Sequence, residues 1–326
     1  MNRRITFGFL AAFAFASAST PVQVQAEGYP AKPIRIVVSF AAGGNTDTPI
    51  RVVAKGLSDV LGVATMVDNR PGAGGNLGAE FVAKATADGY TLLACNVATH
   101  SVNSALYAKL PFDPVKDFSS ISMIGSVPNV LIVNPSSPAK TLSDFIAYAR
   151  LHPDKASVAS AGIGTSQHLV VELLRSLTGA PLFHVPYKGG APALGDLLGG
   201  QVSSLVSGLT TAAPSIAAGK VRALAVTTAA RSTLFPQIPT VAESGIAGVD
   251  VGSWSGLCAP TGTPSAIIGK LNAAVRQVLA MPSIQRSLTD MGVDAAASTP
   301  EQLADFIRAE IPKWQKVVRD AGITPE

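Results

Sequence analysis

The sequence predicts an α/β protein with two domains. Short apolar runs alternate with segments of helical periodicity, and glycine-rich turns separate them. The chain has 326 residues, of which 47% are hydrophobic and 14% are charged, so it is long and apolar enough for two cores. The alternation occurs in two sets, with an extended passage before and after the second. We therefore expect domain 1 to combine residues 27–127 and 252–326, and domain 2 to span residues 128–251.

Residues 1–26 have the pattern of a secretory signal peptide. Arg3 and Arg4 precede an apolar stretch at residues 5–18 that is too short to span a bilayer. Val24-Gln25-Ala26 resembles a cleavage site, so we expect an exported protein cleaved near Ala26. Cleavage after Ala18 and an uncleaved anchor are the alternatives. The formal net charge is +4 without a dense basic patch, which argues against a nucleic-acid binder.

The first predicted βα unit ends in a glycine turn. Residues 34–40 form an apolar run typical of a strand that is buried on both faces, and Gly43 and Gly44 break it before a helix at residues 49–61. Free backbone N–H groups and the positive end of the helix dipole favour an anion at such a turn. An ordinary turn without a ligand is the alternative. The candidate N-cap residues are Asn45, Thr46 and Asp47.

Two further units complete the first half. A strand at residues 65–67 leads into a glycine-rich turn at 69–76 and a helix at 77–86, without the spacing of a Walker loop or a dinucleotide site. A strand at 90–95 then ends in a polar loop at 96–101. Ligands of parallel, doubly wound sheets bind beyond the carboxyl ends of the strands. We therefore expect the loops at 42–47, 70–75 and 96–100 to face one cleft.

The second half repeats the alternation. Residues 118–133 predict an extended passage broken by Pro128, where we place the first crossing between the domains. A glycine and hydroxyl loop at 161–166 opens a helix at 167–177, and a loop at 207–211 precedes another helix. The chain returns to domain 1 at residues 250–260 through Trp254, a hinge or packing residue, and helices at 264–279, 283–291 and 300–321 follow. The other predicted elements are strands at 156–160, 183–185, 203–206 and 221–227, and helices at 141–151 and 191–198.

The cysteines and histidines have no metal-binding spacing. Cys95 and Cys258 lie in different apolar segments, and spacing alone does not settle whether they pair. We expect two buried, unpaired thiols. Histidines at 100, 152, 168 and 184 are scattered, so we expect no zinc site and no cofactor.

The sequence lacks a clear catalytic motif. Gly252-Ser253-Trp254-Ser255-Gly256 has Trp at the nucleophile position of a G-x-S-x-G motif. A hydrolase would need a serine paired with His100 or His168, and spacing fixes no third partner. The simpler interpretation is that each histidine is hydrogen-bonded and orders its loop. We expect no enzymatic activity, with a secreted hydrolase as the alternative.

Neutral hydrogen-bond donors follow the predicted strands in both halves. Hydroxyl and amide groups, together with backbone N–H groups exposed beside glycine, suit a carboxylate ligand. Asp47 is the exception, because its carboxylate would serve either as a helix cap or as a ligand contact. The neutral donors are Asn45, Thr46, Asn96, Thr99, Thr165, Ser166 and Ser207.

Several motifs occur in order along the chain. They include Gly43-Gly44-x-x-Asp47, Asn69-Arg70-Pro71-Gly72-Ala73-Gly74-Gly75-Asn76, Asp88-Gly89-Tyr90-Thr91-Leu92, His184-Val185-Pro186-Tyr187-Lys188-Gly189 and Asp196-Leu197-Leu198-Gly199-Gly200-Gln201-Val202. With these motifs the chain resembles the periplasmic substrate-binding proteins of tripartite tricarboxylate transporters, the Bug family. The resemblance covers essentially the whole chain after residue 26.

The resemblance implies a type II periplasmic binding protein, a Venus flytrap with two interdomain crossings. It implies a periplasmic monomer that captures a small carboxylate (a dicarboxylate, tricarboxylate or aromatic acid) and delivers it to the membrane subunits of the transporter. An anion sensor module for a signalling system is the alternative. The expected ligand contacts are Gly43, Gly44, Asn45, Asp47, Asn96, Thr99, His100, Ser160, Gly162, Thr165, Ser166, His168, Tyr187 and Ser207.

The sequence departs from the family pattern at three loops. Phe40-Ala41-Ala42 stands where proline is usual before the glycines, and His100 ends a loop where small residues are commoner. Ser207-Gly208 lacks the acidic or amide residues often found there. If that position selects an amino group, its loss points away from amino acids and towards a plainer dicarboxylate or an aromatic acid.

Overall fold

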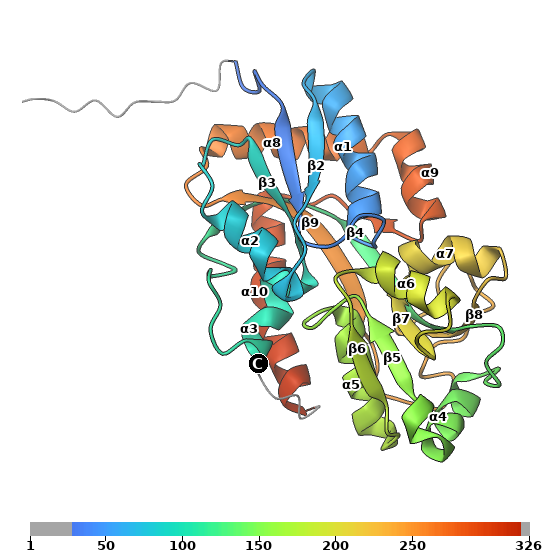
Figure 1. The fold of residues 1–326 in the computed structure, drawn as a ribbon. Helices are drawn as coiled ribbons and strands as arrows, with labels where there is room; N and C mark the ends of the chain where they lie inside the picture. The colour runs from blue at the N-terminus through green and yellow to red at the C-terminus, as the bar shows by residue number, and fades with distance from the viewer. Residues whose placement is uncertain (1–27, 321–326) are drawn as a thin grey trace, which may run out of the picture.

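The computed structural model describes residues 28–320, whose strands follow one continuous path (Figure 1). The predicted signal peptide lies outside the described residues. Two short strands, β8 (Arg222–Val226) and β10 (Asp294–Ala295), pair with β4 beside the main path. The order along the path is β2 (Thr65–Asn69), β1 (Ile34–Val38), β3 (Thr91–Asn96), β9 (Gly252–Pro260), β4 (Phe118–Val133), β7 (Ser204–Gly208), β5 (Ser157–Ser160) and β6 (Phe183–Pro186).

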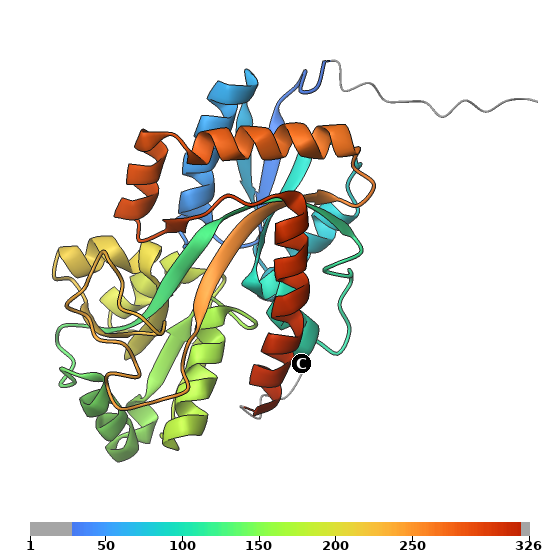
Figure 2. The same ribbon diagram turned by 180° about the vertical axis from the view of Figure 1, so that it is seen from behind.

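Two long antiparallel strands connect two parallel groups. The first group is β2-β1-β3 and the second is β7-β5-β6. Between them, β9 is antiparallel to β3 and to β4, and β4 is antiparallel to β7. Figure 2 shows β4 and β9 running side by side from one group to the other. The predicted parallel sheet is therefore confirmed for the two groups and wrong for the centre, where the chain crosses.

The partner of β4 changes at Pro128. Residues 118–128 of β4 pair with β9, and the last of these pairs joins Pro128 to Gly252. Asn129 begins the pairing with β7, opposite Gly208. The strand thus continues through Pro128, where the sequence predicts a break, but it passes from one sheet to the other there. The division of the chain into domain 1 and domain 2 stays a prediction.

Helices cover both groups of strands. The predicted helices are confirmed to within a few residues, but the loop expected at 96–101 contains a π-helical turn, Ala98–Val102, and the short helix at 103–106 was not predicted. Around the first group lie α1 (Asp47–Leu61), α2 (Asn76–Ala83), α3 (Asn103–Leu106), α8 (Ser265–Leu279), α9 (Pro282–Asp290) and α10 (Pro300–Asp320). Around the second lie α4 (Leu142–Leu151), α5 (Ser166–Thr178), α6 (Gly190–Leu198) and α7 (Leu209–Ala217).

Strand β1 shows why the first group is a core element. Ile34, Ile36 and Val38 pack in one apolar cluster, and Val37 packs in another. Both faces of the strand are therefore covered, as its continuous apolar run predicts.

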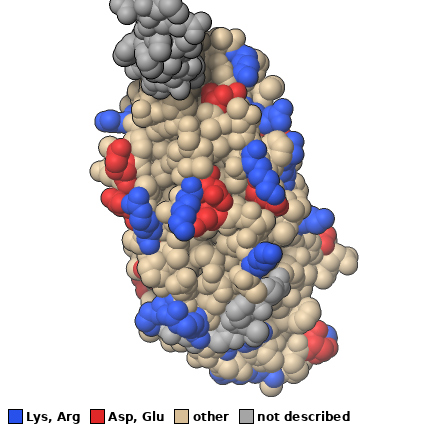
Figure 3. Space-filling model, turned by 90° about the vertical axis from the view of Figure 1, so that its left-hand side faces the viewer, with Lys and Arg blue, Asp and Glu red and all other residues tan. Residues whose placement is uncertain are grey.

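Among residues 28–320, no helix combines the length and apolar character that a membrane span requires. Figure 3 shows Lys and Arg side chains beside Asp and Glu over one face of the molecule, which offers no extended basic surface.

Trp254 of β9 is a packing residue. Its Nε1 donates a hydrogen bond to Glu310 Oε2 of α10 at 3.1 Å, and Trp314 Nε1 donates to the same oxygen at 2.7 Å. Its ring meets Phe306 edge to face. These contacts attach β9 to α10.

The two cysteines form a disulfide between β3 and β9, so the prediction of unpaired thiols was wrong. Cys95 lies opposite Gly256, and Leu93 lies opposite Cys258, which makes the cysteines diagonal neighbours on one face of the sheet. Between them, Gly256 lies so close to β4 that an added Cβ would be 2.9 Å from Ser122 O. The antiparallel register thus unites residues that are 163 positions apart.

Candidate ligand-binding cleft

A cleft is lined by loops from both groups of strands. Ser253 of β9 also lines it. We call Phe40, Gly44, Asn45, Thr46, Asn96, Val97 and Ala98 the first wall. We call Ala161, Thr165, Ser166, Gln167, Gly189, Gly190 and Gly208 the second wall.

The loops on the two sides of the cleft are in contact. Ala41 N donates to Lys188 O across the cleft at 3.0 Å. At Gly208, an added Cβ would lie only 2.5 Å from the Asn45 side chain. The structure is therefore in a closed arrangement, and a side chain at residue 208 would oppose it.

Four helices begin at the cleft. The residues at or before the starts of α1, α5, α6 and α7 all belong to its lining. On the first wall, the amides of Gly44, Asn45 and Thr46 have no acceptor among the described residues. Each helix start carries partial positive charge. Because Lys, Arg, Asp and Glu are all absent from the lining, the local field comes from backbone dipoles and favours an anion.

Asp47 supports the first wall from behind. Its Oδ2 accepts from Gly43 N at 2.8 Å and from Arg51 Nε at 2.9 Å, and its Oδ1 accepts from Asn69 Nδ2 at 2.8 Å. Burial alone would raise the pKa of this carboxyl, but these hydrogen bonds outweigh burial and hold the pKa below its usual value. Both oxygens are thus engaged in ordering the turn. Thr46 occupies the N-cap position without a side-chain cap.

Hydroxyl groups hold the corresponding turn of the second wall. Thr165 Oγ1 donates to Gly162 O at 2.6 Å and accepts from His168 N at 3.3 Å, which caps α5. Ser160 Oγ accepts from Gly162 N at 3.0 Å and lies 2.7 Å from His184 Nε2. Neutral hydrogen bonds therefore order this turn, whereas the carboxylate of Asp47 orders the turn of the first wall.

Two stacked histidines lie beneath that turn. The rings of His168 and His184 are 4.3 Å apart, and His168 Nδ1 accepts from Gly164 N at 3.3 Å. Burial, with Arg175 nearby, lowers the pKa of His168 to about 4. Burial also lowers the pKa of His184 to about 3, helped by His168 and Arg175. Both rings are neutral at pH 7 and place no full charge near the cleft.

Glu172 completes this buried group. Its carboxylate forms an ion pair with Arg175 and lies 3.7 Å from His168 Nε2. Burial raises the pKa of Glu172, and the Arg175 charge opposes that rise.

Of the predicted ligand contacts, the cleft brings together Gly44, Asn45, Asn96, Thr165 and Ser166. The others do not line it, and several have partners of their own. Thr99 Oγ1 lies 3.0 Å from His100 Nδ1, and Ser207 Oγ donates to Gly208 O. Tyr187 donates to Asp196 at 2.6 Å, and burial and Asp196 raise the pKa of Tyr187 to about 12. The residues outside the lining are Gly43, Asp47, Thr99, His100, Ser160, Gly162, His168, Tyr187 and Ser207.

The structure adds lining residues that sequence reasoning missed. Gly189 is the N-cap residue of α6 and Gly190 is its first residue, so a further glycine turn before a helical pattern was the available signal. Gln167 donates to Asn129 Oδ1 at 2.8 Å, which ties the start of α5 to the point where β4 changes sheets. Thr46, one of the predicted neutral donors, also lines the cleft, and the other additions are Phe40, Val97, Ala98, Ala161, Gly208 and Ser253.

Comparison with known proteins identifies what the chain is similar to. The model of the tripartite tricarboxylate transporter family receptor matches residues 50–323. The periplasmic binding protein BugD is 36% identical, with a TM-score of 0.88 over 91% of this chain and 100% of its own. Rpa4515 of R. palustris, solved with adipate, is 38% identical, with a TM-score of 0.88 over 91% of this chain and 100% of its own. MatC of Rhodopseudomonas palustris, solved with malate, is 37% identical, with a TM-score of 0.84 over 89% of this chain and 100% of its own. The predicted α/β periplasmic-binding-protein fold is confirmed.

Proposed function

The chain belongs to the tripartite tricarboxylate transporter receptor family, and from this premise we propose that it captures a small dicarboxylate in the cleft and delivers it to the membrane subunits of a transporter. The predicted family is confirmed. So is the prediction that the protein is not an enzyme, because this family and its solved members are substrate-binding proteins.

The convergence of helix starts on an uncharged cleft carries the proposal. An organic anion that leaves water needs several hydrogen-bond donors, and the first turns of α1, α5, α6 and α7 offer backbone N–H groups. A carboxylate held in this way needs no arginine or lysine.

The arrangement of the lining favours two carboxylates without an amino group. Helix α1 begins at the first wall, and α5, α6 and α7 begin at the second. Each wall would therefore hold one carboxylate. Phe40, Val97 and Ala98 provide apolar surface for the carbon chain between them. An ammonium group would require a carboxylate partner, and the lining has none. MatC with malate and Rpa4515 with adipate show relatives that bind such acids.

Ligand binding then stabilises closure. A ligand shifts an open–closed equilibrium only by its better contacts in one state. A dicarboxylate held by both walls makes its full set of contacts when they meet, as they do at Ala41 and Lys188. In this account the protein is exported as a monomer to the periplasm, with residues 1–26 removed near Ala26.

The test compares malate with aspartate on the chain comprising residues 27–326. These ligands differ mainly in a hydroxyl against an ammonium group. Calorimetric titration and thermal unfolding should show binding of malate, succinate or adipate and weaker binding of aspartate. A ligand at a hundred times its Kd adds about 2.7 kcal/mol to the free energy of unfolding.

A matched pair of variants locates the site. Asn45→Ala should weaken dicarboxylate binding, because it removes the side-chain NH2 group of Asn45, a neutral hydrogen-bond donor, from the cleft lining. Gln285→Ala, at an exposed position of α9, should bind as the unchanged protein does. No thermal shift with any carboxylate at millimolar concentration, or equal affinity in both variants, would contradict the proposed site.

A further inference from the structure

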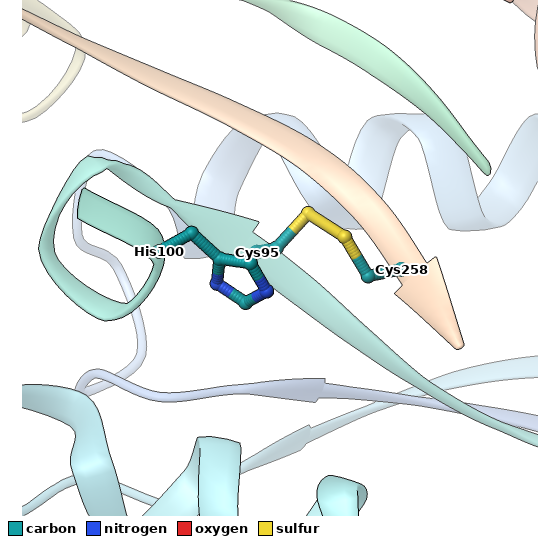
Figure 4. Close-up of side chains that lie close together, drawn as sticks. All are labelled: Cys95, His100 and Cys258. Atoms are coloured by element: carbon teal, nitrogen blue, oxygen red, sulfur yellow. A yellow bond between two sulfur atoms is a disulfide. The ribbon is translucent and has the colours of Figure 1, made fainter. Parts of the chain in front are cut away.

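Three possible metal ligands meet outside the cleft lining. Cys95 lies on β3, His100 in the π-helical turn that follows it, and Cys258 on β9 (Figure 4). The two sulfurs and a ring nitrogen of His100 all lie within 4.8 Å of one another. All three side chains are fully buried. Sequence spacing could not reveal this group, because the pairing of β3 with β9 creates it.

His100 is oriented as a metal ligand would be. Its Nδ1 is 3.0 Å from Thr99 Oγ1, and that hydroxyl donates to Asn96 O. Thr99 Oγ1 therefore accepts from Nδ1–H, which leaves the lone pair of Nε2 free. Nε2 is buried and has no hydrogen-bond partner among the described residues. A histidine whose second nitrogen is held by a hydrogen bond is the usual arrangement at a metal site, whereas an unpartnered buried nitrogen is rare.

A surface groove reaches one member of this group, His100. Its lining includes His100, Phe118 of β4, Asn272 of α8 and Arg308 of α10. His100 stands at its inner end, since its ring is buried against Phe118 at 4.7 Å. An ion that reaches the cluster from this groove therefore does so past the buried His100 ring.

We propose that reduction of the Cys95–Cys258 disulfide creates a zinc site formed by both cysteine sulfurs and His100 Nε2. A dithiol reductant supplies two electrons and two protons, the S–S bond breaks into two thiols, and the reductant becomes a disulfide. Zn²⁺ then displaces the two thiol protons and binds two thiolates and the neutral imidazole. Water from the groove takes the fourth position, as in zinc sites with three protein ligands.

Charge favours Zn²⁺ over Cu⁺ at this position. Two thiolates and a neutral histidine give a site of zero net charge with Zn²⁺ and of −1 with Cu⁺. The surroundings are apolar, with Cys95, Val97, Phe118 and Leu303 in one hydrophobic cluster. An uncompensated buried charge is costly, so the neutral complex is preferred although both ions accept thiolates.

The buried histidines of the second wall form a weaker candidate. His168, Glu172 and His184 also approach within 4.8 Å. However, the Gly164 amide occupies His168 Nδ1, Ser160 occupies His184 Nε2, and Arg175 neutralises Glu172. A cation would have to displace these partners, whereas His100 Nε2 has none to displace among the described residues.

The experiment measures zinc binding by the chain comprising residues 27–326 in both redox states. Protein is reduced with a phosphine, freed of reductant without oxygen, and titrated with Zn²⁺ against a chromogenic chelator. We expect one tightly bound zinc per reduced chain and none in the disulfide form. X-ray absorption of the zinc-loaded protein should show two sulfur ligands at about 2.3 Å and a nitrogen or oxygen shell at about 2.0–2.1 Å. A shell without sulfur would overturn the proposal.

Variants distinguish the proposed zinc ligand His100 from Thr99, which orients its ring. His100→Phe should lower zinc affinity at least about tenfold while the disulfide form stays folded, and Thr99→Val should lower it by about tenfold through the loss of ring orientation. His152→Gln, at an exposed histidine outside the cluster, is the matched control and should bind zinc as the unchanged protein does. Equal zinc binding by oxidised and reduced protein, or unchanged affinity in His100→Phe, would overturn the proposal. If His100→Phe does not fold, the absorption spectrum of the unchanged protein decides.

Discussion

The two walls of the cleft use the same local design but support it with different chemistry. In each, a strand ends in a glycine-containing turn and a helix begins at the cleft. A buried carboxylate, Asp47, orders the turn of the first wall, and hydroxyls with neutral histidines order that of the second. The charge of Asp47 is balanced by Arg51, away from the lining. The comparison teaches that an anion site needs similar backbone dipoles, not similar side chains, on its two sides.

Removing the carboxylate of the first wall should have the largest effect on stability. Asp47→Ala leaves Gly43 N, Asn69 Nδ2 and Arg51 without their acceptor. We expect a loss of about 3 kcal/mol in the free energy of unfolding at pH 7, measured in urea, because breaking a buried charged network costs that much. Asp59→Ala, at an exposed position of the same helix, is the control. A loss no larger than in the control would show that the first wall does not depend on Asp47.

The same variant has a distinct pH dependence. The folded-state pKa of Asp47 is below its unfolded value, so its stabilisation is present above the unfolded pKa and disappears as pH falls through the folded pKa. The difference between the unchanged protein and Asp47→Ala should therefore shrink in acid.

Acidification should weaken the second wall through its histidines. The pKa of His168 is about 4 in the folded protein and about 6.5 when unfolded, so the unfolded state binds more protons between these values. The contribution of neutral His168 to the free energy of unfolding is then fully present above pH 6.5 and is lost as the pH falls towards 4. At pH 5 this amounts to about 2 kcal/mol for His168 alone. Between pH 7 and pH 5, the free energy of unfolding measured in urea should fall by about 2 kcal/mol less in His168→Gln than in the unchanged protein. An equal fall in both proteins would contradict a buried, neutral His168 ring.

A third change acts where the walls meet. Gly208→Ala places a Cβ about 2.5 Å from Asn45 only when the cleft is closed, and the φ of −66° at residue 208 suits alanine. We expect about a tenfold loss of dicarboxylate affinity by calorimetry, equivalent to about 1.4 kcal/mol, without loss of fold. Gly195→Ala, which meets no atom within 4 Å on α6, is the control. Unchanged affinity in Gly208→Ala would mean that ligand binds without this closure.

Local pattern was enough to predict most elements and the position of the cleft. The apolar run of β1 and the glycines after it mark a strand end and a helix start, and the hydroxyls of Thr165 and Ser166 mark another. Because parallel strands end on one side, the loops at 42–47 and 96–100 converge on the cleft as expected, whereas the expectation for the loop at 70–75 was wrong, since none of its residues lines the cleft. Asn45, Asn96, Thr165 and Ser166 could therefore be placed in the cleft before the fold was known.

What sequence reasoning missed depends on contacts between distant segments. The Cys95–Cys258 disulfide follows from the register of two antiparallel strands, which neither local segment specifies. The donors that occupy both oxygens of Asp47 include Asn69, which β2 brings beside it. His100 lies one residue after Thr99 in a polar loop, but the π-helical turn places it in the core. These positions are set by tertiary packing.

The smallest expected effect distinguishes a cap from a binding residue. Thr165 and Thr141 both accept the third amide of their helices, α5 and α4, but Thr165 lines the cleft and Thr141 does not. Thr165→Ala and Thr141→Ala should each lower the free energy of unfolding by about 1 kcal/mol, the usual cost of an N-cap. Only Thr165→Ala should also weaken dicarboxylate binding, because it loosens the turn that presents the first amides of α5. If both variants bind ligand equally well, the second wall holds its ligand without this cap, and the contrast with the carboxylate-supported first wall becomes sharper.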